Sequence, residues 1–183
     1  KTSSAASDVY KRQGSRRDLS RLLSMIERGE ELTIPEKEYD PDYMILGITG
    51  PPGVGKSTLV GRIISYWKDR GKKVAVLAID PSSPRTGGAL LGDRLRMDSA
   101  DSGEGVFVRS LSTRGNPGGI SASLMAMSRL LAYCGWEKII IETVGSGQSE
   151  LKIVAFADKI ILVDGPDRGL SLIHISEPTR LRS

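Results

Sequence analysis

The feature that most constrains this chain is a glycine-rich segment, Gly50-Pro-Pro-Gly-Val-Gly-Lys-Ser57, which fits the pattern G-x-x-x-x-G-K-[ST]. A short apolar run at 43–48 precedes the segment and a helical stretch at 56–70 follows it, as the pattern requires. The glycines allow successive backbone N–H groups to point into one concavity, and the N-terminus of the following helix adds partial positive charge. The segment therefore predicts a loop that binds the phosphates of a nucleotide.

Two side chains of this loop have predicted chemical roles. We expect Lys56 to reach the β- and γ-phosphates and the Ser57 hydroxyl to bind Mg²⁺. The residues expected to contact the nucleotide are Gly50, Pro51, Pro52, Gly53, Val54, Gly55, Lys56, Ser57 and Thr58. The alternative interpretation is a plain Gly/Pro turn between a strand and a helix.

Further apolar runs alternate with helical stretches along the chain. Runs at 73–79, 106–109, 138–142 and 159–163 are typical of buried parallel strands, and the spacing at 120–134 predicts a helix. Strands separated by helices imply a mostly parallel sheet with helices on both faces. The predicted fold class is therefore α/β, a P-loop NTPase that is incomplete at its C-terminus.

The N-terminal part has a different pattern. Apolar residues recur at helical spacing between 15 and 28, and Gly29 follows them as a stop signal. The polar stretch 30–42 indicates a connector. We therefore divide the chain into an amphipathic helix with its connector at 14–40 and a partial nucleotide-binding domain at 41–169.

The two ends of the chain are related in an unusual way. Residues 8–13 can be encoded by GAT GTG TAT AAG AGA CAG, and the reverse complement of that DNA word encodes residues 170–175. Two unrelated protein ends should not be readable from opposite strands of one word. We therefore expect 1–13 and 170–183 to be tails derived from translated sequencing adaptors and exclude them from fold reasoning. The alternative is two natural tails that match by chance.

Composition narrows the possible functions. The formal charge of +4 comes mostly from the two terminal segments, so it gives no reason to expect a nucleic-acid partner. No run approaches the roughly 18 apolar residues of a membrane span, so we expect no membrane contact and a cytoplasmic protein. One Cys and one His exclude a disulfide framework and a Cys-rich or His-based metal cluster.

Acidic residues end two of the predicted strands. Asp80 follows the second run and Glu142 ends the fourth, which places both at the carboxyl edge of a parallel sheet, where ligands bind. Mg²⁺ prefers oxygen ligands and is commonly held by one or two carboxylates. Asp80 and Glu142 are therefore candidate metal ligands beside Ser57, with a helix cap or turn former as the alternative.

Three further segments are candidates for a nucleotide-dependent switch. Glu142-Thr-Val-Gly145 has the acidic-x-x-Gly form in which Gly145 would offer its N–H to a γ-phosphate. Asp93 could contact Mg²⁺ or its waters, and Arg96 could pair with phosphate oxygens, unless the two form only a solvated ion pair. Gln148 could orient the attacking water, with a switch-loop or helix-capping role as the alternative.

Several blocks in order resemble one known family. They are 47–58, Asp80-Pro-Ser-Ser, Thr86-Gly-Gly-Ala-Leu-Leu-Gly-Asp-Arg-Leu-Arg-Met97, Thr113-Arg-Gly and Glu142-Thr-Val-Gly-Ser-Gly-Gln-Ser-Glu150. Together they resemble the methylmalonyl-CoA mutase-associated GTPases, the group of MeaB, ArgK and MMAA. The phosphate loop is shared by many NTPases, whereas the other blocks are much more specific.

The resemblance implies a dimeric P-loop GTPase that binds an adenosylcobalamin-dependent mutase of the methylmalonyl-CoA mutase type. GTP binding and hydrolysis would gate cofactor loading and protect the mutase. The resemblance implies that Lys56 contacts the phosphates, that Arg96 lies in the switch region near them, and that a metal site is formed by Ser57, Asp80, Asp93 and Glu142. The candidate catalytic residues are therefore Lys56, Asp93, Arg96, Glu142 and, from its position in the chain, Gln148.

Two alternatives remain open at this point. One is a GTPase that delivers a metal to another enzyme, and the other is an ATP-dependent transport-system kinase. The guanine-reading Asn-Lys-x-Asp motif is absent, so the preference for GTP is inherited from the resemblance. We expect the 183-residue chain itself to turn over GTP poorly.

Overall fold

The computed structural model describes residues 15–35, 42–80, 105–112, 119–143, 157–165 and 174–176. The predicted tail 1–13 lies outside these ranges, as does the predicted tail 170–183 apart from 174–176.

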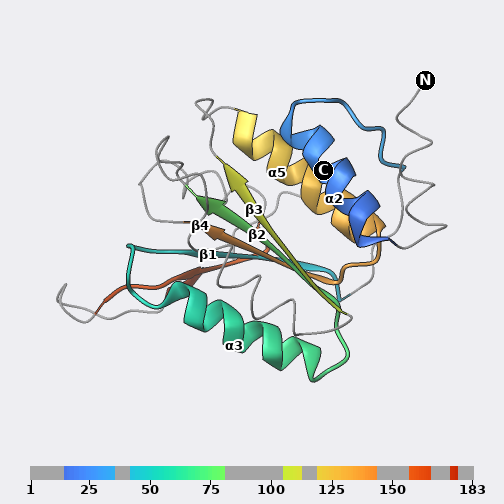
Figure 1. Cartoon of the computed structure of the whole chain (residues 1–183). Helices are drawn as coiled ribbons and strands as arrows, with labels where there is room; N and C mark the ends of the chain where they lie inside the picture. Colours follow the sequence, from blue (N-terminus) through green and yellow to red (C-terminus); the bar gives the residue numbers. More distant parts are fainter. Residues whose placement is uncertain are drawn as a thin grey trace.

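A single twisted sheet forms the centre of the molecule (Figure 1). Its strands are β1 (Met44–Thr49), β2 (Val74–Asp80), β3 (Val106–Ser112), β4 (Lys138–Thr143), β5 (Lys159–Leu162) and β6 (His174–Ser176). They lie in the order β3-β2-β4-β1-β5-β6, and β1 to β5 are parallel. Every apolar run that the sequence predicts to be a strand is one.

Helices cover both faces of the sheet, as predicted (Figure 1). The helices α2 (Arg16–Glu27) and α5 (Gly119–Tyr133) pack beside each other on one face, and α3 (Lys56–Lys68) covers the other. None of the helices in the described ranges is long and apolar enough to span a membrane.

Two details differ from the sequence-based prediction. The strand β3 continues to Ser112, beyond the predicted end at 109, because it follows β2 to the end of that strand. The strand β6, which the sequence did not predict, pairs antiparallel with β5. Its residues fall in the segment predicted to be adaptor-derived, and that assignment remains a prediction.

Successive side chains of the central strands point to opposite faces of the sheet and contribute to two separate hydrophobic clusters. In β4, Ile139 and Ile141 face the cluster under α2 and α5, whereas Ile140 faces the cluster under α3. All three are fully buried, as expected of strands that are covered on both faces. The core therefore fixes the register of β4 and, with it, the position of the residue that follows Ile141.

The amphipathic helix α2 packs as its sequence pattern predicts. The Ser15 side chain caps its N-terminus by accepting from the Arg17 N–H, and Gly29 leaves its C-terminus at a φ of 81°. Its apolar face is buried in the cluster under α5 and consists of Leu19, Leu22, Leu23 and Ile26.

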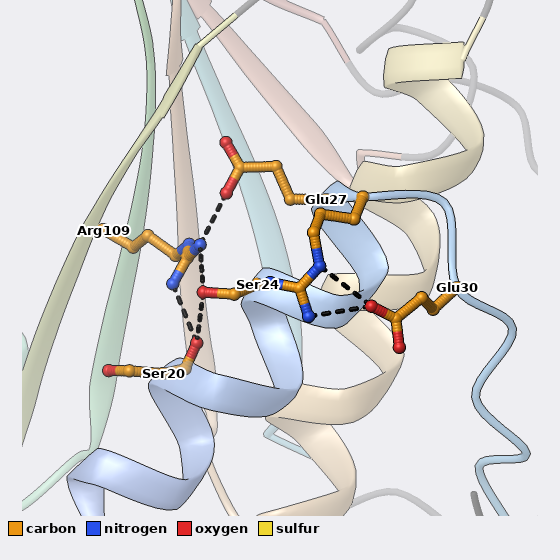
Figure 2. A network of polar contacts seen from close by, with 6 residues as sticks. Ser20, Ser24, Glu27, Glu30 and Arg109 are labelled. Atoms are coloured by element: carbon orange, nitrogen blue, oxygen red, sulfur yellow. Dashed lines mark hydrogen bonds and ion pairs between the residues drawn. The ribbon is translucent and has the colours of Figure 1, made fainter.

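A polar network also attaches α2 to the edge strand β3 (Figure 2). The Arg109 guanidinium donates to the Ser20 carbonyl at 3.0 Å, the Ser24 hydroxyl at 3.0 Å and the Glu27 carboxylate at 2.5 Å. Arg109 has a side-chain exposure of only 14 %, and its contacts with Ser20 and Ser24 are partly shielded from water. Next to this network, the exposed side chains of Arg28 and Glu30 form an ion pair at 2.7 Å.

A second ionic cluster lies at the amino ends of the central strands. The Lys72 ammonium pairs with Asp42 at 2.5 Å and Glu137 at 2.9 Å. The hydrogen bond to Asp42, followed by that to Glu137, raises the pKa of Lys72. Lys138 donates to the Asp42 carbonyl. These contacts fix the residues just before β1, at the edge of the sheet opposite the phosphate loop.

Two arginines near α2 provide a matched test of how β3 is attached to this helix. Arg109 on β3 contacts α2, whereas Arg28 follows α2 and its side chain pairs with Glu30. We expect Arg109→Leu to lower the free energy of unfolding by about 1–3 kcal/mol, because the half-buried Ser20 and Ser24 oxygens and the Glu27 carboxylate lose their charged donor. Arg28→Leu removes an ion pair whose side chains are 61 % and 45 % exposed, and it should change the free energy of unfolding by less than about 0.5 kcal/mol. Urea titration of both variants measures the difference, and equal losses would contradict the assignment.

Candidate nucleotide-binding site

The phosphate loop begins where β1 leaves the sheet. Gly50 has a φ of 142°, and a Cβ atom at this position would overlap the backbone carbonyl of Val163. The Val163 N–H also donates to the Thr49 carbonyl at 2.8 Å. Glycine is therefore required at the first position of the loop because the main chain after β5 passes directly beside it.

The loop turns into α3 through residues in the left-handed region. Gly53 and Gly55 have φ values of 80° and 90°, which other residues adopt only with strain. Gly55 is the N-cap of α3 and offers no side-chain cap, so the first-turn N–H groups depend on other acceptors. Such an arrangement suits an anion at the helix N-terminus.

The Lys56 side chain folds back over the loop. Its ammonium group donates to the Gly50 carbonyl at 2.7 Å and to the Pro51 carbonyl at 2.5 Å, and the residue is only 5 % exposed. These carbonyls fix the ammonium at the first turn of the loop. The predicted phosphate-binding lysine therefore lies within the loop that would hold the phosphates.

Glu142 brings a buried carboxylate to the same place. Its Oε1 accepts a hydrogen bond from the Ser57 hydroxyl at 3.2 Å, and the residue is 1 % exposed. Among the residues that the structure describes, no group bonds to its Oε2. Burial raises the pKa of Glu142, although the Ser57 hydrogen bond and the Lys56 charge oppose that shift.

The pair of Ser57 and Glu142 fits a Mg²⁺ site. A hydroxyl and a carboxylate oxygen are ligands that Mg²⁺ prefers, and the buried Oε2 still has acceptor capacity. A divalent cation there would offset the unfavourable burial of the carboxylate charge. The two predicted metal ligands on β4 and α3 are thus close together.

The remaining predicted site residues are only partly covered by the structure. Asp80 ends β2, next to β4 at the carboxyl edge, but its side chain is outside the described part. Asp93, Arg96, Gly145 and Gln148 lie entirely outside the described residues. Their roles therefore remain predictions.

One contact at this edge was missed by sequence reasoning. The Thr143 hydroxyl donates to the Thr49 hydroxyl oxygen at 3.0 Å, and both residues are buried. Each threonine ends a strand next to a predicted site residue, Gly50 or Glu142. A polar residue at the end of an otherwise apolar strand was the only sequence signal available.

The two glycines of this segment differ in the space around them and give a direct test. Gly50→Ala should lower the free energy of unfolding by about 3 kcal/mol or more, because the new methyl overlaps the Val163 carbonyl. Gly61→Ala, within α3 and with open space around it, should raise it by about 0.5–1 kcal/mol. Thermal denaturation distinguishes them, and a tolerated Gly50→Ala would refute the close approach.

The buried carboxylate predicts a specific pH dependence of stability. Because burial raises its pKa, the folded chain retains a proton on Glu142 that the unfolded chain loses above the ordinary value of 4.5. Stability therefore falls as pH rises from there through the folded-state pKa. Without nucleotide and metal, Glu142→Gln should therefore stabilise the chain at pH 7, because it removes the buried charge. Urea titrations from pH 4 to 8 would contradict this if both curves coincided.

Comparison with known families also indicates a nucleotide-binding protein. Residues 39–176 match the sequence model of the family described as methylmalonyl Co-A mutase-associated GTPase MeaB. The matched range includes the phosphate loop, Glu142 and the segments between them that the structure does not describe.

Individual relatives agree with the family match. A Pyrococcus abyssi protein with the name of a GTPase is 45% identical over 162 residues, which cover 86% of this chain and 50% of the relative. GTPase ArgK of Escherichia coli is 36% identical, with 82% and 48% covered. The mitochondrial methylmalonic aciduria type A homolog of Caenorhabditis briggsae is 40% identical, with 73% and 33% covered.

A solved structure shares the fold. The crystal structure of an LAO/AO transport system kinase superposes with a TM-score of 0.62 at 27% identity, covering 87% of this chain and 49% of that one. The chain thus spans about half the length of the first relatives that it matches. Its motifs, fold and matched range show that the chain belongs to the family of methylmalonyl-CoA mutase-associated GTPases of the MeaB type.

Proposed function

We propose that the longer protein to which this chain belongs binds GTP with Mg²⁺ and hydrolyses it to GDP and phosphate. The observation that carries the proposal is the junction of β1, β4 and α3. There the Ser57 hydroxyl donates to the buried Glu142 carboxylate, and the Lys56 ammonium is bound by the carbonyl of Gly50 in the same loop. Cationic, hydroxyl and carboxylate groups around a glycine-rich turn are the set that phosphoryl transfer from a nucleotide requires.

The phosphates would be bound mainly by the backbone and one lysine. The N–H groups at the start of α3 point toward the loop, and the helix dipole favours negative charge there. Lys56 is fixed by the Gly50 and Pro51 carbonyls and would exchange one of these contacts for β- and γ-phosphate oxygens. Its charge would thus be ready at the transferring group.

Ser57 and Glu142 would hold the metal. When bound, Mg²⁺ neutralises the charge that develops on the phosphate oxygens and orients them. Ser57 supplies a hydroxyl oxygen from the first turn of α3, and Glu142 supplies a carboxylate or holds a metal-bound water from the end of β4. The hydrogen bond between them sets their spacing.

The remaining roles are proposed from the family motifs. Asp80 and Asp93 would complete the metal environment, and Arg96 would neutralise phosphate charge. Gly145 would donate its N–H to the γ-phosphate, and Gln148 would orient water. The family match over 39–176 includes all five residues and supports these assignments.

We extend the proposal to the biological role of the longer protein. The family description names methylmalonyl-CoA mutase, so we propose a mutase of that cobalamin-dependent type as the partner. In this role GTP binding and hydrolysis would gate adenosylcobalamin loading and protect the mutase. A homodimer and a cytoplasmic location belong to the same proposal.

A nucleotide competition tests the activity most directly. With the complete protein, fluorescent GTP should bind in the presence of Mg²⁺ and be displaced by GTP far better than by ATP. Lys56→Ala should weaken binding by about 10- to 100-fold, because it removes charge-assisted hydrogen bonds to the phosphates. Lys68→Ala, an exposed lysine near the other end of α3, is the matched control and should leave the affinity unchanged.

The same experiment decides between the two nucleotide hypotheses. The related solved structure is that of a transport system kinase, which gives an ATP-dependent function a specific basis. Displacement by ATP as strong as by GTP would overturn the GTPase proposal in favour of that alternative. Binding that Lys56→Ala leaves intact would show that the loop is not the nucleotide site.

A further inference from the structure

The buried hydroxyl pair of Thr49 and Thr143 lies where two parts of the proposed GTPase site meet. Thr49 is the last residue of β1, directly before the phosphate loop. Thr143 is the last residue of β4, directly after Glu142. Their hydroxyl oxygens are 3.0 Å apart, and the residues are 8 % and 0 % exposed.

The pleat of the strands places this pair on the opposite face from the metal-site pair. Ile48 is in register with Glu142, and both are associated with the α3 side of the sheet. Because successive residues of a strand point to opposite faces, Thr49 and Thr143 point toward the side of α2 and α5. The end of β4 is thus bound on both faces of the sheet. Glu142 contacts Ser57 after the phosphate loop on one face, and Thr143 contacts Thr49 before it on the other.

Thr49 is also held by its other neighbour in the sheet. Its carbonyl accepts from the Val163 N–H at 2.8 Å, and its side chain accepts from Thr143. The residue that begins the loop therefore has β5 on one side and β4 on the other. Glu142, in contrast, has only the 3.2 Å contact with Ser57 to orient its side chain among the described residues.

The buried hydrogen bond between Thr49 and Thr143 requires a definite spacing and orientation of the ends of β1 and β4. A hydroxyl that lacks its partner in such an environment is unfavourable, so the two strand ends are stable only at the spacing that allows the bond. Apolar side chains would hold the strands together across a wider range of spacings, because hydrophobic packing has no direction.

We propose that Thr49 and Thr143 are positioning residues that hold the Glu142 carboxylate at the correct distance from the phosphate loop for Mg²⁺. This inference rests on the proposed function, because it assigns the pair a role in metal-dependent nucleotide binding. It goes further in naming two residues that touch neither nucleotide nor metal and act through Glu142 and Gly50.

Four variants test the role. Thr143→Val removes one hydroxyl and keeps the shape, and Thr143→Ser keeps the hydroxyl and serves as the rescue. The double variant Thr49→Val/Thr143→Val removes both hydroxyls and leaves neither without a partner. Ser128→Ala, which removes a buried hydroxyl of α5 that bonds to no described group, is the control.

The first readout is the affinity for fluorescent GTP with Mg²⁺ and with EDTA. Thr143→Val should lose about five- to tenfold in affinity with Mg²⁺ and less than about twofold with EDTA, the range that one hydrogen bond supports. Thr143→Ser and Ser128→Ala should match the unaltered chain. Equal losses under both conditions, or no loss, would overturn the proposal.

The double variant separates positioning from stability. It should regain thermal stability relative to Thr143→Val, because no buried hydroxyl is left without a partner. Its weak response to Mg²⁺ should persist, because nothing restores the spacing of Glu142. Recovery of both properties would show that the pair contributes only to packing, and would overturn the proposal.

Hydrogen exchange in the absence of nucleotide is the second readout. Amides at 50–57 should exchange about fivefold faster in Thr143→Val than in Ser128→Ala. If the unaltered chain fails to bind GTP, the proposed function fails, and this measurement still decides whether the pair positions the loop. Unchanged exchange at 50–57 would overturn the positioning role.

Discussion

The phosphate loop depends on the position of β1 at the centre of the sheet. The main chain of β1 pairs with β4 on one side and with β5 on the other, and these pairings fix the position of its last residue, Thr49. Beyond that residue the chain after β5 leaves room only for a glycine at position 50. The turn into α3, the place of Lys56 and the contact of Ser57 with Glu142 all follow from this fixed starting point.

The site combines favourable and unfavourable contributions to stability. The isoleucines of β4 are buried on both faces and make the strand a rigid support, while Glu142 at its end is buried with an acceptor atom that no described group satisfies. Such a carboxylate is tolerated because the surrounding packing determines its place. The proposed Mg²⁺ site therefore includes a carboxylate whose burial lowers stability in the absence of a ligand.

Most of the fold could be predicted from the sequence, because periodicity and glycine signals are local. The apolar runs located β1 to β5, and the loop pattern identified Lys56 and Ser57 before any geometry was known. The missed features are contacts between distant parts of the chain. Arg109 bonds to residues 82–89 positions away, and the two threonines are 94 positions apart. Strand order brings these side chains together, and a single sequence does not contain that information.

The two edges of the sheet differ in how solvent can affect them. Lys72, Asp42 and Glu137 at the amino edge are ionic groups with access to water, so dissolved salt screens their attraction. The hydroxyl pair at the carboxyl edge is uncharged and buried, and ionic strength has little effect on it. Rising salt therefore loosens the entry to β1 before it affects the phosphate loop. The molecule can tolerate changes in its ionic environment at one end while the nucleotide end keeps its geometry.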